Sequence, residues 1–382
     1  MVDYEKPKDR PEIGVFHGFD HVTFWVGNAQ QAAHFYCARL GFEFLAYQGL
    51  ETGNRDTCTH VVNNGRVKFA FKSPLNPTGH EEFAAHHAKH GDGVKDVAFT
   101  VDDSAGIYKK AVERGATSVM EPTVLKDDDG EVIVSSVRTY GDTTHTFVQR
   151  DKYNGIFLPN FAKHHHKEPF NAIVEPPVLE CIDHCVGNQP DGEMEAAAAW
   201  YEKMLDFHRF WSIDDKMLHT EYSALRSVVV ADFDEVVKMP INEPAAGKKK
   251  SQIQEYVDFF GGPGVQHIAL RTENILHAIT QMKARGCNFL TIPAKYYDNL
   301  RIKLKECGTQ VAEDLDVIQK LNILVDYDEK GYLLQIFTKP LEDRPTFFVE
   351  IIQRRNHQGF GAGNFKALFE SIEIDQGKRG NL

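Results

Sequence analysis

The chain has 382 residues, and a hydrophobic content of 42% is enough for two cores or for one duplicated domain. A formal net charge of −12 argues against nucleic acid or an anionic membrane as the main partner. There is no run of eighteen apolar residues, and the polar N-terminus lacks the apolar core of a signal peptide. Six cysteines without a C-x-x-C pair favour a reducing compartment, so we expect a cytoplasmic protein with no transmembrane segment.

Two passages of the chain show the same features in the same order, after a lead-in (residues 1–14) in which we expect no regular element. Each passage begins with a strand-like run containing Asp-His, continues with a helical run, and ends with Gln-Arg. The matching landmarks are Asp20-His21 with Asp183-His184, Phe35-Tyr36 with Trp200-Tyr201, Leu40-Gly41-Phe42 with Leu205-Asp206-Phe207, and Gln149-Arg150 with Gln353-Arg354. So many matches in one order indicate an internal duplication.

The repeat also divides the chain. We predict one domain over 1–155, a proline-containing linker over 156–178 and a second domain over 179–382. Each copy reads as strand, helix and several strands with hairpin turns, which predicts an α+β fold with two open β-barrels. The offset between copies grows from 171 residues at His267 to 204 at Glu350, so about 33 residues are inserted in the second copy, around 296–319.

The linker contains the run His164-His165-His166. Three adjacent side chains cannot all face one ion, because successive side chains of an extended segment point to opposite sides. We therefore interpret this run as a solvated loop.

Equivalent positions of the two copies differ in their capacity to bind a metal. The three positions hold His21, Asp96 and Thr146 in the first copy, and His184, His267 and Glu350 in the second. Two imidazoles and one carboxylate with open coordination positions are typical of non-heme Fe(II) enzymes that activate O2. Spacing alone does not separate iron from zinc, manganese or nickel.

The third candidate ligand, Glu350, lies in a stretch whose first half reads as a strand and whose second half is a glycine-rich turn. A strand-like run places Phe348, Glu350 and Ile352 on one face, and an ionised Glu on an apolar face needs a cation or a hydrogen-bonding partner. The turn over 359–363 is G-x-G-x-G, not the G-x-G-x-x-G of a dinucleotide site, so we reject a nucleotide interpretation. We expect a helix over 366–375 to close the pocket as a lid.

Five motifs carry a family resemblance that covers nearly the whole chain: 180–184 (ECIDH), 264–269 (GVQHIA), 331–337 (GYLLQIF), 348–354 (FVEIIQR) and 357–365 (HQGFGAGNF). The chain resembles the vicinal-oxygen-chelate superfamily of duplicated βαβββ modules and, within it, the 4-hydroxyphenylpyruvate dioxygenase family in its animal form. The resemblance implies a homodimeric enzyme of tyrosine and phenylalanine catabolism. It also implies Fe(II) held by His184, His267 and Glu350, with 4-hydroxyphenylpyruvate and O2 as substrates and homogentisate and CO2 as products.

The resemblance further assigns a substrate pocket. It implies polar, catalytic contacts from Ser227, Asn242, Gln252, Gln266 and Gln335, and aromatic walls from Phe337, Phe348, Phe360 and Phe365. Without the resemblance, each phenylalanine would be read as ordinary core packing. Simple alternation places Gln266 on the face opposite to His267, so this residue reaches the pocket only through a bulge or a twist.

Three alternatives remain open. 4-Hydroxymandelate synthase shares substrate, iron and fold. The resemblance implies that the synthase has a smaller aliphatic residue at the position of Phe365, so Phe365 favours the dioxygenase. An extradiol catechol dioxygenase would share the ligands but lack the glycine-rich tail. A metal-free binding module of the bleomycin-resistance kind is the third, and a measurement of bound iron separates it from the others. The resemblance implies that the first copy gives structural support and a dimer surface.

Overall fold

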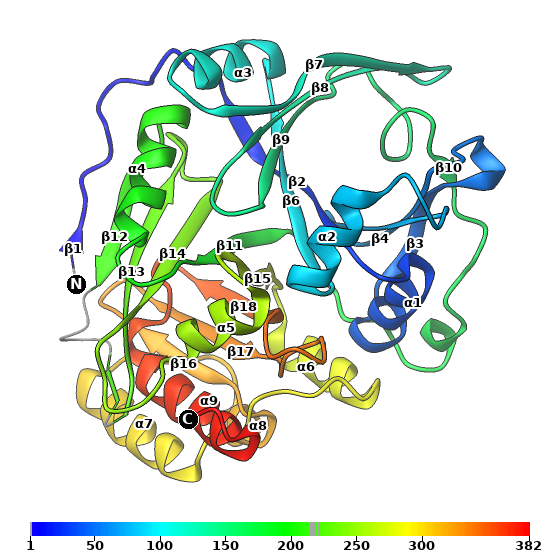
Figure 1. The fold of residues 1–382 in the computed structure, drawn as a ribbon. Coiled ribbons are helices and arrows are strands. Elements are labelled where there is room, and N and C mark those ends of the chain that lie inside the picture. The colour runs from blue at the N-terminus through cyan, green and yellow to red at the C-terminus, as the bar shows by residue number, and fades with distance from the viewer. Residues whose placement is uncertain (1, 214–218, 221) are drawn as a thin grey trace.

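Two mixed β-sheets organise the chain, and each curls into an open half-barrel (Figure 1). The computed structural model describes residues 2–213, 219–220 and 222–382. Within these residues each sheet has nine strands, in the orders β10-β3-β4-β5-β2-β6-β9-β8-β7 and β1-β12-β13-β14-β11-β15-β18-β17-β16. No helix in the described ranges is both long and apolar enough to cross a membrane.

The first half contains the expected order of one strand, one helix and several strands, and it contains this order twice. They are β1 (Val2–Asp3), β2 (Phe16–Trp25), α1 (Ala29–Leu40), β3 (Glu43–Gln48), η1 (Leu50–Thr52), β4 (Thr57–Asn64), β5 (Val67–Pro74), α2 (Glu81–His90), β6 (Gly93–Val101), α3 (Ser104–Glu113), β7 (Thr117–Asp127), β8 (Gly130–Arg138), β9 (Thr144–Gln149), β10 (Ala162–Lys163) and η2 (Pro169–Ala172).

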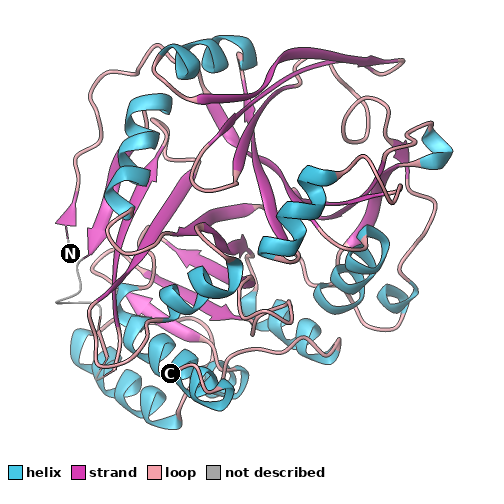
Figure 2. Cartoon of the chain, in the orientation of Figure 1, coloured by secondary structure: helices cyan, strands magenta, loops and turns pink. Residues whose placement is uncertain are grey.

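The second half repeats this order and adds helices. Its elements are β11 (Ile182–Asn188), α4 (Met194–Leu205), β12 (His208–Ile213), β13 (Ala224–Ala231), β14 (Lys238–Ala245), α5 (Gln252–Phe260), β15 (Gly264–Arg271), α6 (Ile275–Ala284), α7 (Ala294–Cys307), α8 (Leu315–Leu321), β16 (Leu324–Tyr327), β17 (Tyr332–Phe337), β18 (Phe348–Arg355), η3 (Ala362–Asn364) and α9 (Phe365–Arg379). Figure 2 shows the helices packed outside the strands.

Strand registers confirm the duplication at the level of single residues. His21 pairs with Ala98, which pairs in turn with Thr146. In the second half, His184 pairs with Ala269, which pairs with Glu350. The predicted equivalence of these positions is therefore also an equivalence in space.

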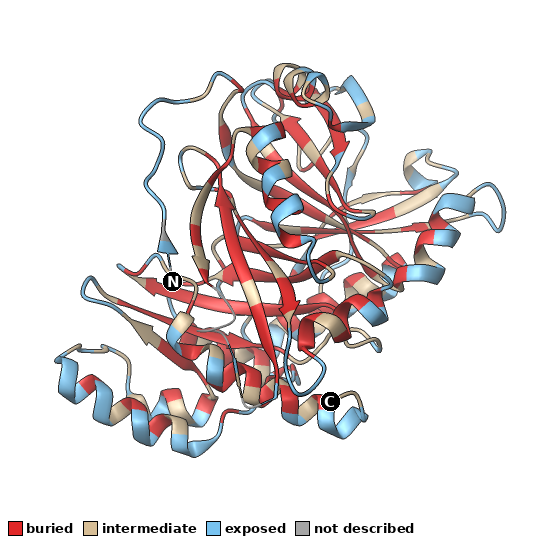
Figure 3. Cartoon of the chain, turned by 60° about the vertical axis from the view of Figure 1, so that its left-hand side comes forward, coloured by how far each residue is buried: buried red, intermediate tan, exposed pale blue. Residues whose placement is uncertain are grey.

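The expected insertion consists of helices α7 and α8, which lie between α6 and β16. The first half runs directly from α3 to β7 at the same point. Much of α7 is exposed on the outer surface of the molecule, with buried positions on one side only, as the mixed colours in Figure 3 show.

Two short strands lie in segments that were predicted as a lead-in and as a linker, and both pair with a sheet. Val2–Asp3, within the lead-in where no element was expected, pairs with Trp211 and Ser212 of β12 in the second sheet. Ala162–Lys163, within the predicted linker, pairs with β3 of the first sheet. The domain boundaries at 155 and 178 stay predictions.

Side-chain capping explains where several of these helices begin. The Asn28 side chain accepts a hydrogen bond from the Gln31 backbone at the start of α1, and Gly41 ends the helix in a left-handed conformation with φ 72°. Asp103 and Asn274 cap α3 and α6 in the same way at equivalent points of the two halves. The duplication therefore includes the local start signals of the helices.

The cores of the two halves are continuous. Phe24 of β2 packs edge-on against Phe347 just before β18, with ring centroids 5.1 Å apart. Phe16 packs against Phe207 at the same distance. Because aromatic pairs bury large apolar areas, these contacts hold the two sheets in a fixed relation.

Candidate metal centre and pocket

Three potential metal ligands converge from adjacent strands of the second sheet. His184 lies on β11, His267 on β15 and Glu350 on β18, and all three residues are buried. Glu350 Oε2 is 3.3 Å from His184 Nε2 and 3.4 Å from His267 Nε2. One donor atom from each side chain lies within 4.8 Å of the others. The sequence predicted this set of residues, and the fold brings it together.

A β-bulge directs each of the two imidazoles. The pairing of β11 with β15 shifts register between Ile182 and His184, so that Asp183 is the extra residue, and again opposite Gln266. As a result each histidine and the residue before it face the same side. His184 Nδ1 donates to Asp183 Oδ1 at 2.7 Å, and His267 Nδ1 lies 3.0 Å from Gln266 Oε1. Both Nε2 atoms are thereby left to face Glu350.

Arg354 fixes the Asp183 carboxylate in place. Its Nε and Nη2 atoms donate to Asp183 at 2.8 and 2.7 Å, while Nη1 donates to the carbonyls of His357 and Gly359. This guanidinium therefore joins β18, the bulge at Asp183 and the glycine-rich turn. Asp183 and Arg354 are 171 residues apart in sequence, and both side chains are less than a tenth exposed.

Burial and pairing oppose each other in the pKa values of this cluster. Burial would raise the pKa of Asp183, but Arg354 holds it well below the usual value. Burial likewise disfavours the charged form of Glu350, yet the two imidazoles keep its pKa below normal. The carboxylates therefore stay ionised inside the protein, as a cation site requires.

Aromatic rings surround the triad. Phe348 stacks on the His267 ring at 4.8 Å between centroids and 16° between planes, and Phe337 meets the same ring edge-on at 6.0 Å. Phe360 lies edge-on to His184 at 5.1 Å. These contacts limit the rotation of both imidazoles and form apolar walls next to the donor atoms.

The triad opens into a cavity of about 580 Å³, counting the space at its mouth. Eight of the nine residues predicted for the pocket line it: Ser227, Asn242, Gln252, Gln266, Phe337, Phe348, Phe360 and Phe365. Gln266 reaches it through the bulge described above. Sequence reasoning missed the remaining lining residues, which are Val186, Trp211, Leu225, Val229, Pro240, Ile253, Leu368, Phe369 and Ile372.

Gln335 is the one predicted pocket residue that does not line this cavity. It is fully buried on β17, and neither its amide oxygen nor its amide nitrogen has a partner among the described residues. The glycine-rich turn approaches it closely: a Cβ at Gly361, where φ is 77°, would lie 2.2 Å from Gln335 Nε2. Glycine suits this position because it adopts the left-handed conformation without strain and leaves room for the Gln335 side chain.

The helix predicted over 366–375 is present as the longer α9, and it covers one side of the cavity. Phe365, Leu368, Phe369 and Ile372 face the cavity from successive turns. The spacing of three and four residues places them on one side of the helix.

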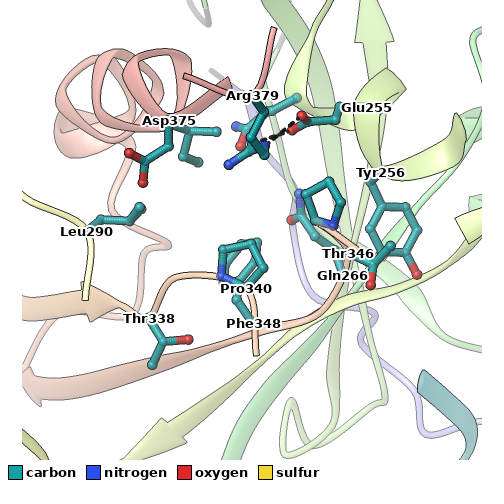
Figure 4. A pocket seen from close by; sticks show the side chains of 13 residues that line it. Glu255, Tyr256, Gln266, Leu290, Thr338, Pro340, Thr346, Phe348, Asp375 and Arg379 are labelled. Carbon is teal, nitrogen blue, oxygen red and sulfur yellow. Dashed lines mark hydrogen bonds and ion pairs between the residues drawn. The ribbon is translucent and has the colours of Figure 1, made fainter. Parts of the chain in front are cut away.

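A second hollow adjoins the first and shares Gln252, Gln266, Phe348 and Ile372 with it. Figure 4 shows this hollow under the end of α9, where Arg379 reaches across to Glu255 of α5. Arg379 donates to the two Glu255 oxygens at 3.1 and 2.8 Å, and Asn381 donates to Oε1 at 2.9 Å. The end of the chain is thus fastened to the helix that carries Gln252.

The network around Asp183 had no predicted role. Its members were already visible as the Asp-His and Gln-Arg landmarks of the repeat, which reappear in the first half as Asp20-His21 and Arg150. Their recurrence was the available signal, and the geometry shows that they orient the candidate ligand His184.

Comparison with known proteins first defines the class. A family model described as the Glyoxalase/Bleomycin resistance protein/Dioxygenase superfamily matches residues 18–147 and 181–336, one match to each half. The duplicated half-barrels and the buried triad of the second half are thus features of a protein of this superfamily.

Full-length relatives then narrow the class. 4-Hydroxyphenylpyruvate dioxygenases from Tetrahymena thermophila and Danio rerio are each 58% identical, over 100% of this chain and 96% of the relative. The enzyme of the same name from Dictyostelium discoideum is 59% identical over 96% of this chain and 100% of its own. The chain belongs to the 4-hydroxyphenylpyruvate dioxygenase family.

Among solved structures, a mutant of 4-hydroxymandelate synthase from Streptomyces coelicolor superposes with a TM-score of 0.82. It covers 94% of this chain and 99% of its own, at 28% sequence identity. The synthase that the sequence left open as an alternative is therefore a more distant relative than the dioxygenases.

Proposed function

We propose that this protein is an Fe(II)-dependent enzyme that converts 4-hydroxyphenylpyruvate and O2 into homogentisate and CO2, in tyrosine catabolism. One observation carries the proposal: two imidazoles and a carboxylate meet on the wall of an aromatic cavity in a chain 56–59% identical to dioxygenases of that name. Loss of CO2 from the 2-oxo acid, hydroxylation of the ring and migration of the side chain make up the reaction.

The residues present fit a divalent iron ion. His184, His267 and Glu350 offer the nitrogen and oxygen donors of a facial triad, and Nε2–Oε2 separations of 3.3 and 3.4 Å suit donors on one side of an ion. Bound Fe(II) would supply the activation of O2 and a common anchor for the 2-oxo acid. Each imidazole keeps its Nδ1 hydrogen on a neighbouring acceptor, so its Nε2 lone pair is available.

Groups of the chain itself would position the substrate. The phenylalanine rings form flat apolar walls for the aromatic ring and exclude water from the reacting carbons. Ser227 and Asn242 face each other across β13 and β14, and Gln252 begins α5 beside them on the cavity wall. These uncharged groups can hydrogen-bond the phenol hydroxyl without competing for the cation. Gln335, which does not line the cavity, remains a proposed contact.

Helix α9 would act as the lid of this pocket. It supplies one wall, and it is tied down by the Arg379–Glu255 pair and by hydrogen bonds from Thr220 and Ser223 to Glu373. Substrate entry would require these ties to open, and closure would keep water and stray reductants from the reacting centre.

Product analysis tests the proposal. The protein is loaded with Fe(II) without oxygen, mixed with 4-hydroxyphenylpyruvate and then exposed to O2. We expect homogentisate with one CO2 per turnover. 4-Hydroxymandelate would move the oxidation to the side chain and support the synthase alternative. A protein that binds no iron and forms neither product would support the metal-free binding module.

We further propose that the enzyme is a homodimer of the cytoplasm, as the family resemblance implies. The first half, which lacks the complete ligand set, would supply the dimer surface. Light scattering of the purified protein measures the mass directly, and a monomer would contradict this part of the proposal.

A further inference from the structure

A second group of histidines lies on the first half, away from the buried triad. Imidazoles from three separate segments meet there: His34 from α1, His60 from β4, and His164 and His166 from the segment after β10. Glu168 follows on the same segment and caps η2. We call these five residues the histidine cluster.

The run of three histidines contributes to this cluster by alternation. The segment runs antiparallel to β3, with Ala162 and Lys163 paired to Tyr47 and Ala46, and the His164 backbone donates to Leu45. Residues 164, 166 and 168 therefore point to one side of an extended chain, while residue 165 points to the other. The interpretation of the run as a solvated loop is confirmed for His165 and His166, which are exposed, and is wrong for His164, which is half-buried against Phe44 and His60. The exposed His166 ring still contacts the rings of His34 and Phe44.

Three members of the cluster present free donor atoms to one another. His34, His166 and Glu168 each place one donor within 4.8 Å of the other two, and the two rings are 4.8 Å apart between centroids. Glu168 Oε1 accepts from the Phe170 backbone, which orients the carboxylate and leaves its other oxygen available.

His164 stabilises this arrangement through contacts at both of its ring nitrogens. Its Nδ1 accepts a hydrogen bond from the His166 backbone, and its Nε2 lies 3.1 Å from His60 Nδ1. Because both ring nitrogens are engaged, His164 is a positioning residue that fixes the backbone of His166.

We propose that His34, His166 and Glu168 bind a divalent first-row cation, of which Zn²⁺ is the best match. Two imidazoles and one carboxylate suit Zn²⁺, which commonly takes three protein ligands and a water in a tetrahedral site. Ca²⁺ and Mg²⁺ prefer oxygen ligands, so two nitrogen donors disfavour them. The ion would fasten the segment after β10 to helix α1.

Metal counting on the iron-loaded enzyme tests the site. Fe(II)-loaded protein is incubated with Zn²⁺ under anaerobic conditions and desalted, and both metals are measured by mass spectrometry. We expect one iron and one zinc per chain. His34→Gln combined with His166→Gln should weaken zinc binding at least tenfold and leave the iron content unchanged. His165→Gln is the matched control, since this neighbouring histidine lies outside the cluster, and it should bind zinc as the wild type does.

A second measurement, of melting temperature, keeps the test valid if the double variant folds poorly. Zinc should raise the melting temperature of the wild type and of His165→Gln, and should leave that of the double variant unchanged. Three results would overturn the proposal: no zinc retained beside the iron in the wild type, equal zinc binding by the double variant, or equal loss of zinc from the His165→Gln control.

Discussion

The two halves of the molecule share a supporting network for a histidine and differ in what that histidine faces. In the first half, His21 Nδ1 lies 2.7 Å from Asp20, which Arg150 holds at 2.8 Å through two nitrogens. His184, Asp183 and Arg354 repeat this arrangement with nearly the same distances. In both halves the aspartate is the extra residue of a bulge.

The contrast lies at the other two ligand positions. Where the second half presents His267 and Glu350, the first has Asp96 and Thr146. Asp96 accepts hydrogen bonds from Thr144 and Thr146 at the same oxygen, Oδ1, at 2.5 and 2.9 Å, so this oxygen is already engaged within the protein. An oriented histidine is therefore part of the scaffold of both halves, and the identity of its two partners distinguishes the candidate metal site of the second half.

The largest effect should come from replacing Glu350 of the second half with threonine, which occupies the equivalent position of the first half. Glu350→Thr removes the only carboxylate of the predicted triad. Turnover should fall more than about 1,000-fold, because residues that merely orient ligands already cost about 10- to 100-fold. Iron content after desalting and the homogentisate rate measure the loss. The matched change in the first half, Thr146→Val, should leave both unchanged, and a Glu350→Thr protein with full iron content would contradict the assigned ligand.

A smaller effect should separate orientation from ligation. Asp183→Asn leaves the Arg354 charge buried without its partner, which should cost about 3 kcal/mol in unfolding free energy and about 10- to 100-fold in iron affinity. Urea unfolding and iron titration measure the two effects.

The control for this change is Asp20→Asn in the first half. It should cost somewhat less stability, because Arg150 is 21% exposed against 6% for Arg354, and should not change iron affinity. If Asp183→Asn changed iron affinity no more than Asp20→Asn does, Asp183 would act on stability alone.

The proposed lid, helix α9, belongs to the second half, and weakening it should have a moderate effect. Arg379→Gln removes the tie to Glu255, and a partly exposed ion pair of this kind contributes about 1 kcal/mol, or roughly a fivefold change in lid opening. We expect more O2 consumed per homogentisate formed, measured with an oxygen electrode and product analysis. Lys378→Gln, one residue earlier and more exposed, should leave the ratio at the wild-type value. An unchanged ratio for Arg379→Gln would contradict the role of this tie in closing the lid.

The smallest effect concerns pH. His21 and Arg150 hold the pKa of Asp20 below its ordinary value of 3.8 in spite of burial. A carboxylate with a lowered pKa in the folded state stabilises the protein above its ordinary pKa, and this contribution is lost as the pH falls further. The difference in unfolding free energy between wild type and Asp20→Asn should be constant from about pH 7 to 5 and shrink below about pH 4. A difference that grows at low pH would contradict the assigned sign.

Much of this site could be predicted from the sequence because the duplication acts as an internal alignment. Matching His21 with His184 and Thr146 with Glu350 exposed the positions that differ, and the period of a strand placed Glu350 on the same face as Phe348. The insertion after His267 followed from offsets alone. The helix at the chain end followed from the glycine turn, although its extent to Arg379 did not.

What the sequence determined by itself is local or repeated: the strands and their period, the duplicated order and the three equivalent positions that hold the candidate ligands. Only the tertiary structure decided the rest. The bulges at Asp183 and Gln266 exist because two strands pair out of step, and the Asp183–Arg354 pair spans 171 residues. The contact of His34 with His166 likewise joins α1 to a segment beyond β10. Register and such distant contacts are set by how sheets close and helices pack, and local residue patterns carry little trace of either.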